Sequence, residues 1–256
     1  MAPAPNELQR RALERGDRRS SLVVYRIARS LIRRILYPWL RVRIEGIENL
    51  DQPGPVIVAP VHRSHLDSAL LGPLTDRRVR ALGKESLFTT PGVGWLCAAL
   101  GAIPVRRAEA DREAMNAARM LLDRGELLIV FPEGTRTSGE VVAPLFDGPA
   151  WLAARTGAPV VPIGIAGTSE AFPPGAMWIR RSTVTIVVGP PIPAPVAAEG
   201  ARSVSRSRLR EFTAVLAEQL QSVQDDAVAG SLGRAGAVRA PDSERPALLR
   251  RLGRRD

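Results

Sequence analysis

The two histidines of the chain, His62 and His65, follow directly on an apolar run, residues 56–59, that is typical of a β-strand. Open parallel sheets bind ligands at the carboxyl ends of their strands, so a reactive site belongs here. A helix beginning near Ser64 would bring Asp67 close to His62, leaving the second imidazole nitrogen to take a proton from an alcohol. We therefore predict that His62 is a general base oriented by Asp67. By spacing alone, a histidine that merely caps a helix is the more frequent explanation.

A metal site is the competing interpretation, because His62 and His65 lie three residues apart and Asp67 follows two residues later. The sequence offers no further histidine, a single cysteine at position 97 and no dense acidic cluster to complete a coordination sphere. We therefore expect neither a metal nor a cofactor. The apolar surroundings of Cys97 indicate a buried, inert thiol, and a lone cysteine favours a cytosolic environment.

A second group of polar residues, Phe131-Pro132-Glu133-Gly134-Thr135-Arg136, also follows an apolar strand-like run. Gly134 permits a tight turn whose backbone amides could face an anion, and Arg136 offers a planar fork for phosphate. A plain β-turn with a surface arginine is the simpler explanation of this segment alone. Residues 101–107 and 161–165 are two further strand ends, and neither indicates a site when it is taken alone. Together, the four segments predict a site that abstracts a proton and holds a phosphate.

From residue 41 onward, β-branched runs alternate with helical stretches, a rhythm typical of a mostly parallel sheet flanked by helices. The expected strands cover residues 41–44, 56–59, 79–82, 102–105, 127–131, 160–165 and 183–188. The expected helices cover residues 66–74, 92–100, 109–124, 149–156 and 204–225. The predicted fold class is α/β, with an amphipathic helix ahead of the sheet.

The chain has 256 residues and is 45% hydrophobic, enough for one domain with a substantial core and two tails. We expect a disordered basic N-terminus over residues 1–19 and a disordered basic tail over residues 226–256. Residues 20–40 should form an amphipathic helix and residues 41–225 the catalytic domain. No apolar segment directly follows the charged start, which argues against a signal peptide.

The segment 20–40 repeats apolar residues at helical spacing and places Arg26, Arg29 and Arg33 on another face. Each arginine would cost about 2.5–3.5 kcal/mol near the centre of a bilayer, so a spanning helix is improbable. A helix lying in the membrane interface is the favoured interpretation, with Tyr37 and Trp39 at the headgroup level. An ordinary helix packed on the core would show the same stripe.

The net charge of +10 lies entirely in the two ends of the chain. Residues 1–44 hold 11 arginines against 3 acidic residues, residues 226–256 hold 7 against 4, and residues 45–225 hold 18 basic against 19 acidic residues. A neutral central domain with basic ends is suited to binding an anionic surface through those ends. It is less suited to binding the phosphate backbone of a nucleic acid through a face of the domain itself. We therefore expect a membrane partner and no nucleic acid.

The strand-end segments together resemble the blocks of the lysophosphatidic acid acyltransferases, the glycerolipid acyltransferases of the bacterial PlsC type. In order, the blocks match residues 62–67, 101–107, 131–136 and 161–162. Residues 84–88 and 91–95 also look like the segment that connects the first two blocks. The resemblance covers roughly residues 40–190, and it implies the α/β fold of glycerol-3-phosphate acyltransferases.

The resemblance implies that His62, oriented by Asp67, deprotonates the free hydroxyl of 1-acylglycerol-3-phosphate. The resulting oxygen attacks the thioester of acyl-coenzyme A or acyl carrier protein, which forms phosphatidic acid in phospholipid biosynthesis. It further implies that the N-terminal helix sits in the membrane. The expected partners are thus a lysophospholipid, an acyl donor and the anionic cytoplasmic face of the cell membrane, where the enzyme is peripheral.

The resemblance also implies that Arg107 and Arg136 hold the phosphate of the acceptor, in a loop shaped by Glu133 and Gly134. Thr135, in the same block, and Lys84, in the connecting segment, complete the candidate substrate-binding residues.

Two departures from the family pattern bear on the acceptor. Val61 stands where the family often has asparagine, and Asp147 follows Phe146 where the family usually has a basic residue. Another lysophospholipid or another hydroxylated lipid therefore stays open as the acceptor. The alternative from a different class is a catalytically idle lipid-binding protein, but such a protein has no reason to retain both His62 and Asp67.

Overall fold

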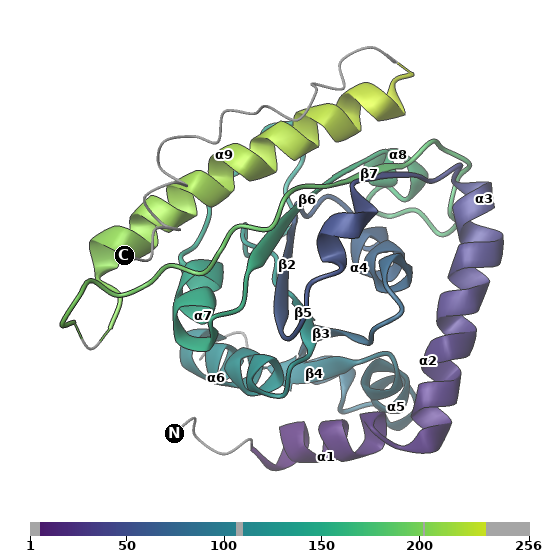
Figure 1. The fold of residues 1–256 in the computed structure, drawn as a ribbon. Helices are drawn as coiled ribbons and strands as arrows, with labels where there is room; N and C mark the ends of the chain where they lie inside the picture. The colour runs from purple at the N-terminus through teal and green to yellow at the C-terminus, as the bar shows by residue number, and fades with distance from the viewer. Residues whose placement is uncertain (1–5, 106–109, 202, 234–256) are drawn as a thin grey trace.

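The structure, a computed structural model, describes residues 6–105, 110–201 and 203–233. Within this part of the chain, all seven predicted strands form one sheet (Figure 1). They are β1 (Arg43–Glu45), β2 (Val56–Pro60), β3 (Val79–Lys84), β4 (Ala102–Val105), β5 (Leu127–Ile129), β6 (Val160–Ala166) and β7 (Thr185–Val188). The predicted α/β fold class is confirmed.

The order of the strands brings three loops together. The sheet runs β1-β7-β6-β2-β5-β3-β4, and its neighbouring strands are parallel except β6 and β7. Because β2 lies between β5 and β6 and is parallel to both, the loops that follow these three strands leave the same edge of the sheet. The first and third predicted blocks, residues 62–67 and 131–136, follow β2 and β5, so the topology places these two blocks side by side.

Both faces of the sheet are buried, which explains the continuous apolar runs of its strands. In β2, Val56 and Val58 pack into the core on one face, whereas Ile57 and Ala59 pack into the core on the other. The first face is covered by α4 (Leu66–Leu71) with the short helix η3 (Gly72–Leu74). The second is covered by α6 (Ala110–Asp123) and α7 (Gly148–Thr156). The remaining short helices are η2 (Ile47–Leu50), η4 (Glu85–Leu87), α5 (Pro91–Ala99) and α8 (Thr168–Ala171).

The long helix α9 (Arg206–Ser231) lies along β6 and β7 and contributes to both cores. The approach is close at Gly164, where a Cβ atom would stand 2.1 Å from the carbonyl oxygen of Val223. The helix continues through residues 226–231, so disorder from residue 226 onward is wrong for that part of the tail. Residues 234–256 lie outside the described residues.

The expectation of disorder through residue 19 is also wrong, because Glu7–Gly16 form helix α1. Asn6 caps the helix in a reciprocal capping box with Gln9, which satisfies backbone donors at the start of the helix. Glu7 forms ion pairs with two of the arginines that had indicated disorder, Arg10 and Arg11. The helix buries Ala12 and Leu13 as it packs on α5 and β4.

Residues 19–39 form the predicted helix as three consecutive segments, α2 (Arg19–Leu31), the π-helical η1 (Ile32–Leu36) and α3 (Tyr37–Trp39). This column flanks one side of the molecule in Figure 1. It is docked by Tyr25, whose hydroxyl accepts from the backbone N–H of Val79, and by Tyr37, whose hydroxyl donates to the carbonyl of Leu70. No helix of the described segments is long and apolar enough to cross a membrane.

Asp17, in the turn between α1 and α2, ties both helices to the sheet. Its carboxylate accepts from the guanidinium groups of Arg78, Arg80 and Arg124 at 3.1, 2.7 and 2.8 Å. Hydrogen bonds from Arg124 and Arg80 hold the pKa of Asp17 below its ordinary value, although partial burial acts in the opposite direction. The N-terminal helices are therefore an integral part of the fold.

Candidate active site

The predicted base and its carboxylate are in direct contact. His62 lies in the loop after β2, and Asp67 lies in the first turn of α4, which begins at Leu66. Nδ1 of His62 stands 3.0 Å from Oδ2 of Asp67. The other ring nitrogen, Nε2, is on the far side of the imidazole from Asp67, and the His62 side chain is 18% exposed. This arrangement suits an imidazole that accepts a proton at Nε2.

Asp67 is fully buried, at 0% exposure, and both of its oxygens are held by donors. Oδ2 accepts from the backbone N–H groups of Arg63 and Ser64, each at 2.7 Å, as well as contacting His62. Oδ1 accepts from the hydroxyl of Thr168 at 2.7 Å. A buried carboxylate requires such partners, and here they fix the side chain in the position that orients His62.

The His62 ring is held from a second side by Phe131, the residue that opens the third block. The two rings are stacked, with centroids 3.8 Å apart and planes inclined by 21°. The backbone N–H of His62 donates to Oε2 of Glu133 at 2.9 Å, and its carbonyl accepts from the N–H of Thr137 at 2.9 Å. The loop after β5 therefore positions both the ring and the backbone of the base.

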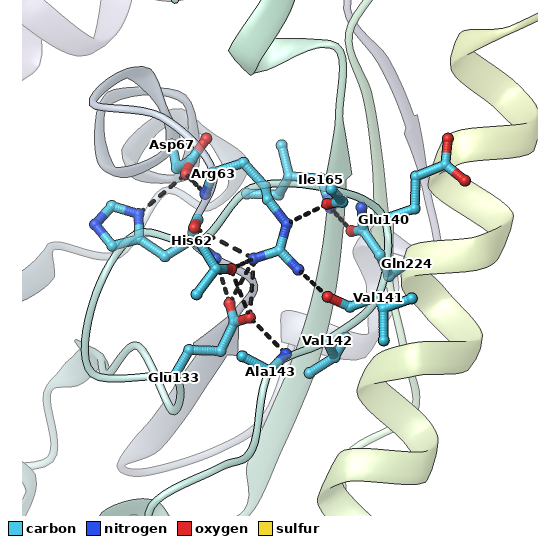
Figure 2. Close-up of polar contacts among 12 residues, drawn as sticks. His62, Arg63, Asp67, Glu133, Glu140, Val141, Val142, Ala143, Ile165 and Gln224 are labelled. Carbon is cyan, nitrogen blue, oxygen red and sulfur yellow. Dashed lines mark hydrogen bonds and ion pairs between the residues drawn. The ribbon is translucent and has the colours of Figure 1, made fainter. Parts of the chain in front are cut away.

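Arg63 and Glu133 form a buried ion pair behind the base (Figure 2). One terminal nitrogen of Arg63 lies 2.9 and 2.8 Å from the two carboxylate oxygens of Glu133. The rest of the guanidinium donates to the carbonyls of Gly139 and Val141 at 2.9 and 3.2 Å. Arg63 thus connects the loop of residues 133–141 to the loop that carries His62 through these hydrogen bonds.

The resemblance implies that Glu133 shapes the loop that holds the phosphate, and Glu133 is hydrogen-bonded within that loop. Glu133 is 3% exposed and accepts from the N–H groups of His62 and Ala143, the Thr137 hydroxyl and the Arg63 guanidinium. Burial raises the pKa of Glu133, but these hydrogen bonds outweigh it and leave the pKa below its ordinary value. Glu133 is therefore a buried, ionised carboxylate whose hydrogen bonds hold the loop together.

Gly134 adopts a positive φ of 70°, and a Cβ atom there would stand 2.7 Å from Cε2 of the Phe146 ring. Its amide donates to the carbonyl of Phe131 at 3.1 Å and closes the predicted tight turn, so the Gly134 N–H itself is used within the turn. Thr135 and Arg136 follow at the exposed tip of the turn.

Arg136 lies near the histidines. The pKa of His65 is lowered by its partial burial and by the positive charge of Arg136. The Arg136 side chain is exposed. An exposed guanidinium near the histidines is suited to binding an anionic group.

Two further cations, Arg107 and Lys84, are predicted to bind substrate, and the structure describes only Lys84. Arg107 lies outside the described residues. Lys84 is exposed at the end of β3, which is separated from β2 by β5. No hydrogen bond or ion pair between described residues connects Lys84 to His62 or Asp67.

The two departures from the family pattern have structural explanations. Val61 is fully buried in the core beneath the site, so the residue before the base packs and does not face substrate. Asp147 accepts a hydrogen bond from the hydroxyl of Thr213 on α9 at 2.6 Å. Its side chain therefore joins α9 to the start of α7.

Arg63 and Thr168 are the functional residues that sequence reasoning did not identify. Arg63 sits within the first block but its partner Glu133 is 70 residues away, and Thr168 follows the fourth block 101 residues after Asp67. The sequence signal that could have identified Thr168 is its position just after the predicted strand of residues 160–165.

The competing metal interpretation finds no support in the described segments, where no group of three or more His, Cys, Asp or Glu side chains could hold a metal ion. His65 is exposed and points to no such cluster. Burial raises the pKa of Cys97, a half-buried thiol, which favours its protonated form.

Comparison with known proteins indicates a family. The family model described as "Acyltransferase" matches residues 41–166, which span the sheet from its first strand to the end of β6. The 126 matched residues are just under half of the chain, and they are similar to this acyltransferase family.

Several relatives are named as such enzymes. The chloroplastic 1-acyl-sn-glycerol-3-phosphate acyltransferase of Arabidopsis thaliana is 31% identical over 161 residues, covering 61% of this chain and 45% of that protein. The 1-acyl-sn-glycerol-3-phosphate acyltransferase of Bacillus subtilis is 26% identical over 185 residues, covering 72% of this chain and 88% of that protein. The chain spans a little under half the length of the first plant relatives that it matches, 46% and 45%.

A solved structure supports the same family. The crystal structure of the 1-acyl-sn-glycerophosphate acyltransferase PlsC from Thermotoga maritima matches with a TM-score of 0.63 and 27% identity. The match covers 83% of this chain and 85% of that one.

Proposed function

We propose that this protein transfers a fatty acyl group from acyl-coenzyme A or acyl carrier protein to the free hydroxyl of 1-acylglycerol-3-phosphate. The product is phosphatidic acid, a precursor in phospholipid biosynthesis. The observation that carries the proposal is the 3.0 Å contact between His62 and a fully buried, fully hydrogen-bonded Asp67 at the carboxyl edge of the sheet. The names of the relatives supply the acyl acceptor.

In this mechanism, Nδ1–H of His62 donates to Asp67, and Nε2 takes the proton from the acceptor hydroxyl. The oxygen then attacks the thioester carbonyl, the carbon–sulfur bond breaks, and His62 gives the proton to the departing thiolate, which leaves as a thiol. Asp67 stabilises the imidazolium that exists between these steps. Arg136 supplies a cation for the phosphate of the acceptor.

The experiment that tests the reaction is thiol release by the full chain, with acyl-coenzyme A or acyl carrier protein as donor and a panel of lysolipid acceptors. We expect the highest kcat/KM with lysophosphatidic acid. His62→Ala should lower kcat by about 10²- to 10⁴-fold, the usual contribution of a general base. Unchanged turnover in this variant, with its fold intact by circular dichroism, would rule out the mechanism. A strong preference for another lysophospholipid would correct the acceptor.

We also propose that the enzyme is peripheral to an anionic membrane, on its cytoplasmic face, through the column of α2, η1 and α3. Five apolar side chains are exposed along it at every fourth residue: Val23, Ile27, Leu31, Ile35 and Trp39, each between 47% and 63% exposed. In a regular α-helix such a row drifts by about 40° per step. The π-helical η1 has a wider turn and opposes this drift, so the row stays on the exposed side.

Arginines flank this row, which is the pattern of an interfacial helix attracted to anionic lipids. Deleting residues 1–40 would remove buried side chains such as Leu13 and Tyr25, so substitution is the sharper test. Ile27→Ser combined with Leu31→Ser and Ile35→Ser should move the protein from sedimenting with anionic vesicles to the supernatant. Val196→Ser, an exposed apolar position in the loop before α9, is the matched control. Undiminished sedimentation of the triple variant would show that the anchor lies elsewhere.

A further inference from the structure

The loop between α8 and β7, residues 172–184, carries the two most exposed large apolar side chains among the described residues. Met177 is 83% exposed and its neighbour Trp178 is 80% exposed. Single exposed apolar residues are common on protein surfaces. An adjacent methionine and tryptophan, both nearly fully in water, present a much larger apolar area at one point.

This loop, which we call the α8–β7 loop, is anchored at its base. The N–H of Arg180 donates to the carbonyl of Ala171 at 2.8 Å, which closes the loop across its neck. Phe172 and Ile179 pack against the core on either side of the exposed pair. The exposure of Met177 and Trp178 therefore comes from a fixed segment that directs them outward.

The α8–β7 loop also continues the apolar row of the N-terminal helices. The guanidinium of Arg181 lies over the ring of Trp39, 5.7 Å from its centroid, and Trp39 is the last member of that row. In Figure 1 the loop that follows α8 reaches the column at α3. Arg180 and Arg181 are exposed, so the loop combines apolar side chains with two positive charges.

We propose that the α8–β7 loop is a second membrane contact, in which Met177 and Trp178 enter the interface of an anionic bilayer. The inference rests on the proposed membrane-surface function and extends it to a segment about 140 residues beyond the N-terminal helices. Tryptophan prefers the headgroup level, where its ring is buried and its N–H stays hydrated. The arginines add attraction to anionic lipid headgroups.

The position of the loop gives this contact a role in the reaction. The loop begins at Phe172, whose carbonyl accepts from the hydroxyl of Ser64 at 3.3 Å, two residues from the base. It also follows directly on α8, which carries Thr168, the residue that holds Asp67. A bilayer bound by this loop therefore lies beside the loop of His62, and a lysolipid can move from the bilayer to the base over a short path.

The test compares Met177→Ser/Trp178→Ser with Val196→Ser in the full chain. Vesicles of phosphatidylglycerol and phosphatidylcholine are sedimented with each protein at physiological ionic strength. We expect the double variant to bind roughly tenfold more weakly, from the loss of two interfacial side chains, and the control to bind like the parent. Equal binding of the double variant and the parent would overturn the proposal.

A spectroscopic measurement separates insertion from an indirect effect. An environment-sensitive NBD fluorophore is attached to Met177→Cys in a Cys97→Ser background, and to Val196→Cys in the same background as control. Vesicles should shift the emission at 177 to shorter wavelength and raise its intensity, with no change at 196. An unchanged emission at 177, from protein that sediments with the vesicles, would overturn the proposal. A change in emission on adding more protein without vesicles would overturn it too, because that change indicates contact between copies of the chain.

These outcomes are distinguishable from a failure of the proposed reaction. If the parent protein shows no His62-dependent thiol release with any acceptor, the reaction is wrong, and vesicle binding and NBD emission still decide the loop. If the reaction is right, the double variant should lose more activity on vesicle-embedded lysophosphatidic acid than on a short-chain, monomeric one. Equal losses on both substrates would count against the loop as a membrane contact.

Discussion

Thr168 donates its hydroxyl hydrogen to Oδ1 of Asp67 across 2.7 Å, and both side chains are fully buried. The other oxygen of Asp67 faces His62 and two backbone N–H groups. Thr168 is therefore the side chain that fixes the rotation of the carboxylate about its own axis, and through it the orientation of the imidazole.

Thr168→Val keeps the shape of the side chain and removes its hydroxyl. Because the lost hydrogen bond is to a charged group, kcat should fall by about tenfold to a hundredfold, with little change in KM for either substrate. Thr168→Ser restores the donor and should bring kcat back to within about threefold of the parent. Steady-state thiol release measures both. Equal losses in the valine and serine variants would point to packing at this position and away from the hydrogen bond.

The Arg63–Glu133 pair should be strongly coupled in stability. Arg63→Met or Glu133→Leu alone leaves one buried charge unpaired and should lower the free energy of unfolding by about 3–5 kcal/mol. The double variant should lose less than the sum of the single variants by about 1–3 kcal/mol. Urea unfolding of the four proteins gives the coupling energy. Additive losses would show that the two side chains act independently.

Glu133 also predicts how stability depends on pH. Its pKa is lower in the folded protein than its ordinary value of 4.5, so its contribution is complete above that value. This contribution of Glu133 to the free energy of unfolding is lost as the pH falls from about 4.5 through the lower pKa of the folded state. In that pH range, Glu133 takes up a proton in the unfolded chain but stays ionised in the folded protein. The melting temperature of the parent should therefore drop more steeply below pH 4.5 than that of Glu133→Gln, which has no group to titrate. If the melting temperatures of the two proteins fell in parallel below pH 4.5, the prediction would be wrong.

Arg136 should act on binding of the acceptor. Arg136→Ala removes an exposed cation beside the histidines and should raise the KM for lysophosphatidic acid by about tenfold to a hundredfold, with a smaller effect on kcat. Arg155→Ala removes the same charge from the exposed surface of α7 and should leave both constants unchanged. An unchanged KM in Arg136→Ala would move the phosphate site to a different cation.

The strands and the predicted base His62 could be identified from the sequence for the same reason. Each strand is a short apolar run bounded by polar or turn residues, and its register on the sheet is not needed to recognise it. His62 and Asp67 are five residues apart, within one loop and one helical turn. Local spacing therefore contained the information for both.

The parts that sequence reasoning missed depend on distant partners. Arg63 and Glu133 are each ambiguous alone, and only the adjacency of β2 and β5 brings them together. Thr168 requires the adjacency of β2 and β6. Helix α1 was hidden because its arginines indicated disorder, whereas the capping box at Asn6 and the burial of Leu13 stabilise it.

The strand order also has a consequence for how the chain folds during synthesis. β1 pairs with β7, and β2 pairs with β5 and β6, so the first two strands have no partner until more than half of the chain has been made. Such long-range pairing makes folding slow and leaves the apolar strand Val56–Pro60 exposed to aggregation meanwhile. We expect nascent chains arrested before β5 to be retained by chaperones, and chains arrested after the ribosome has released β7 to be protease-resistant.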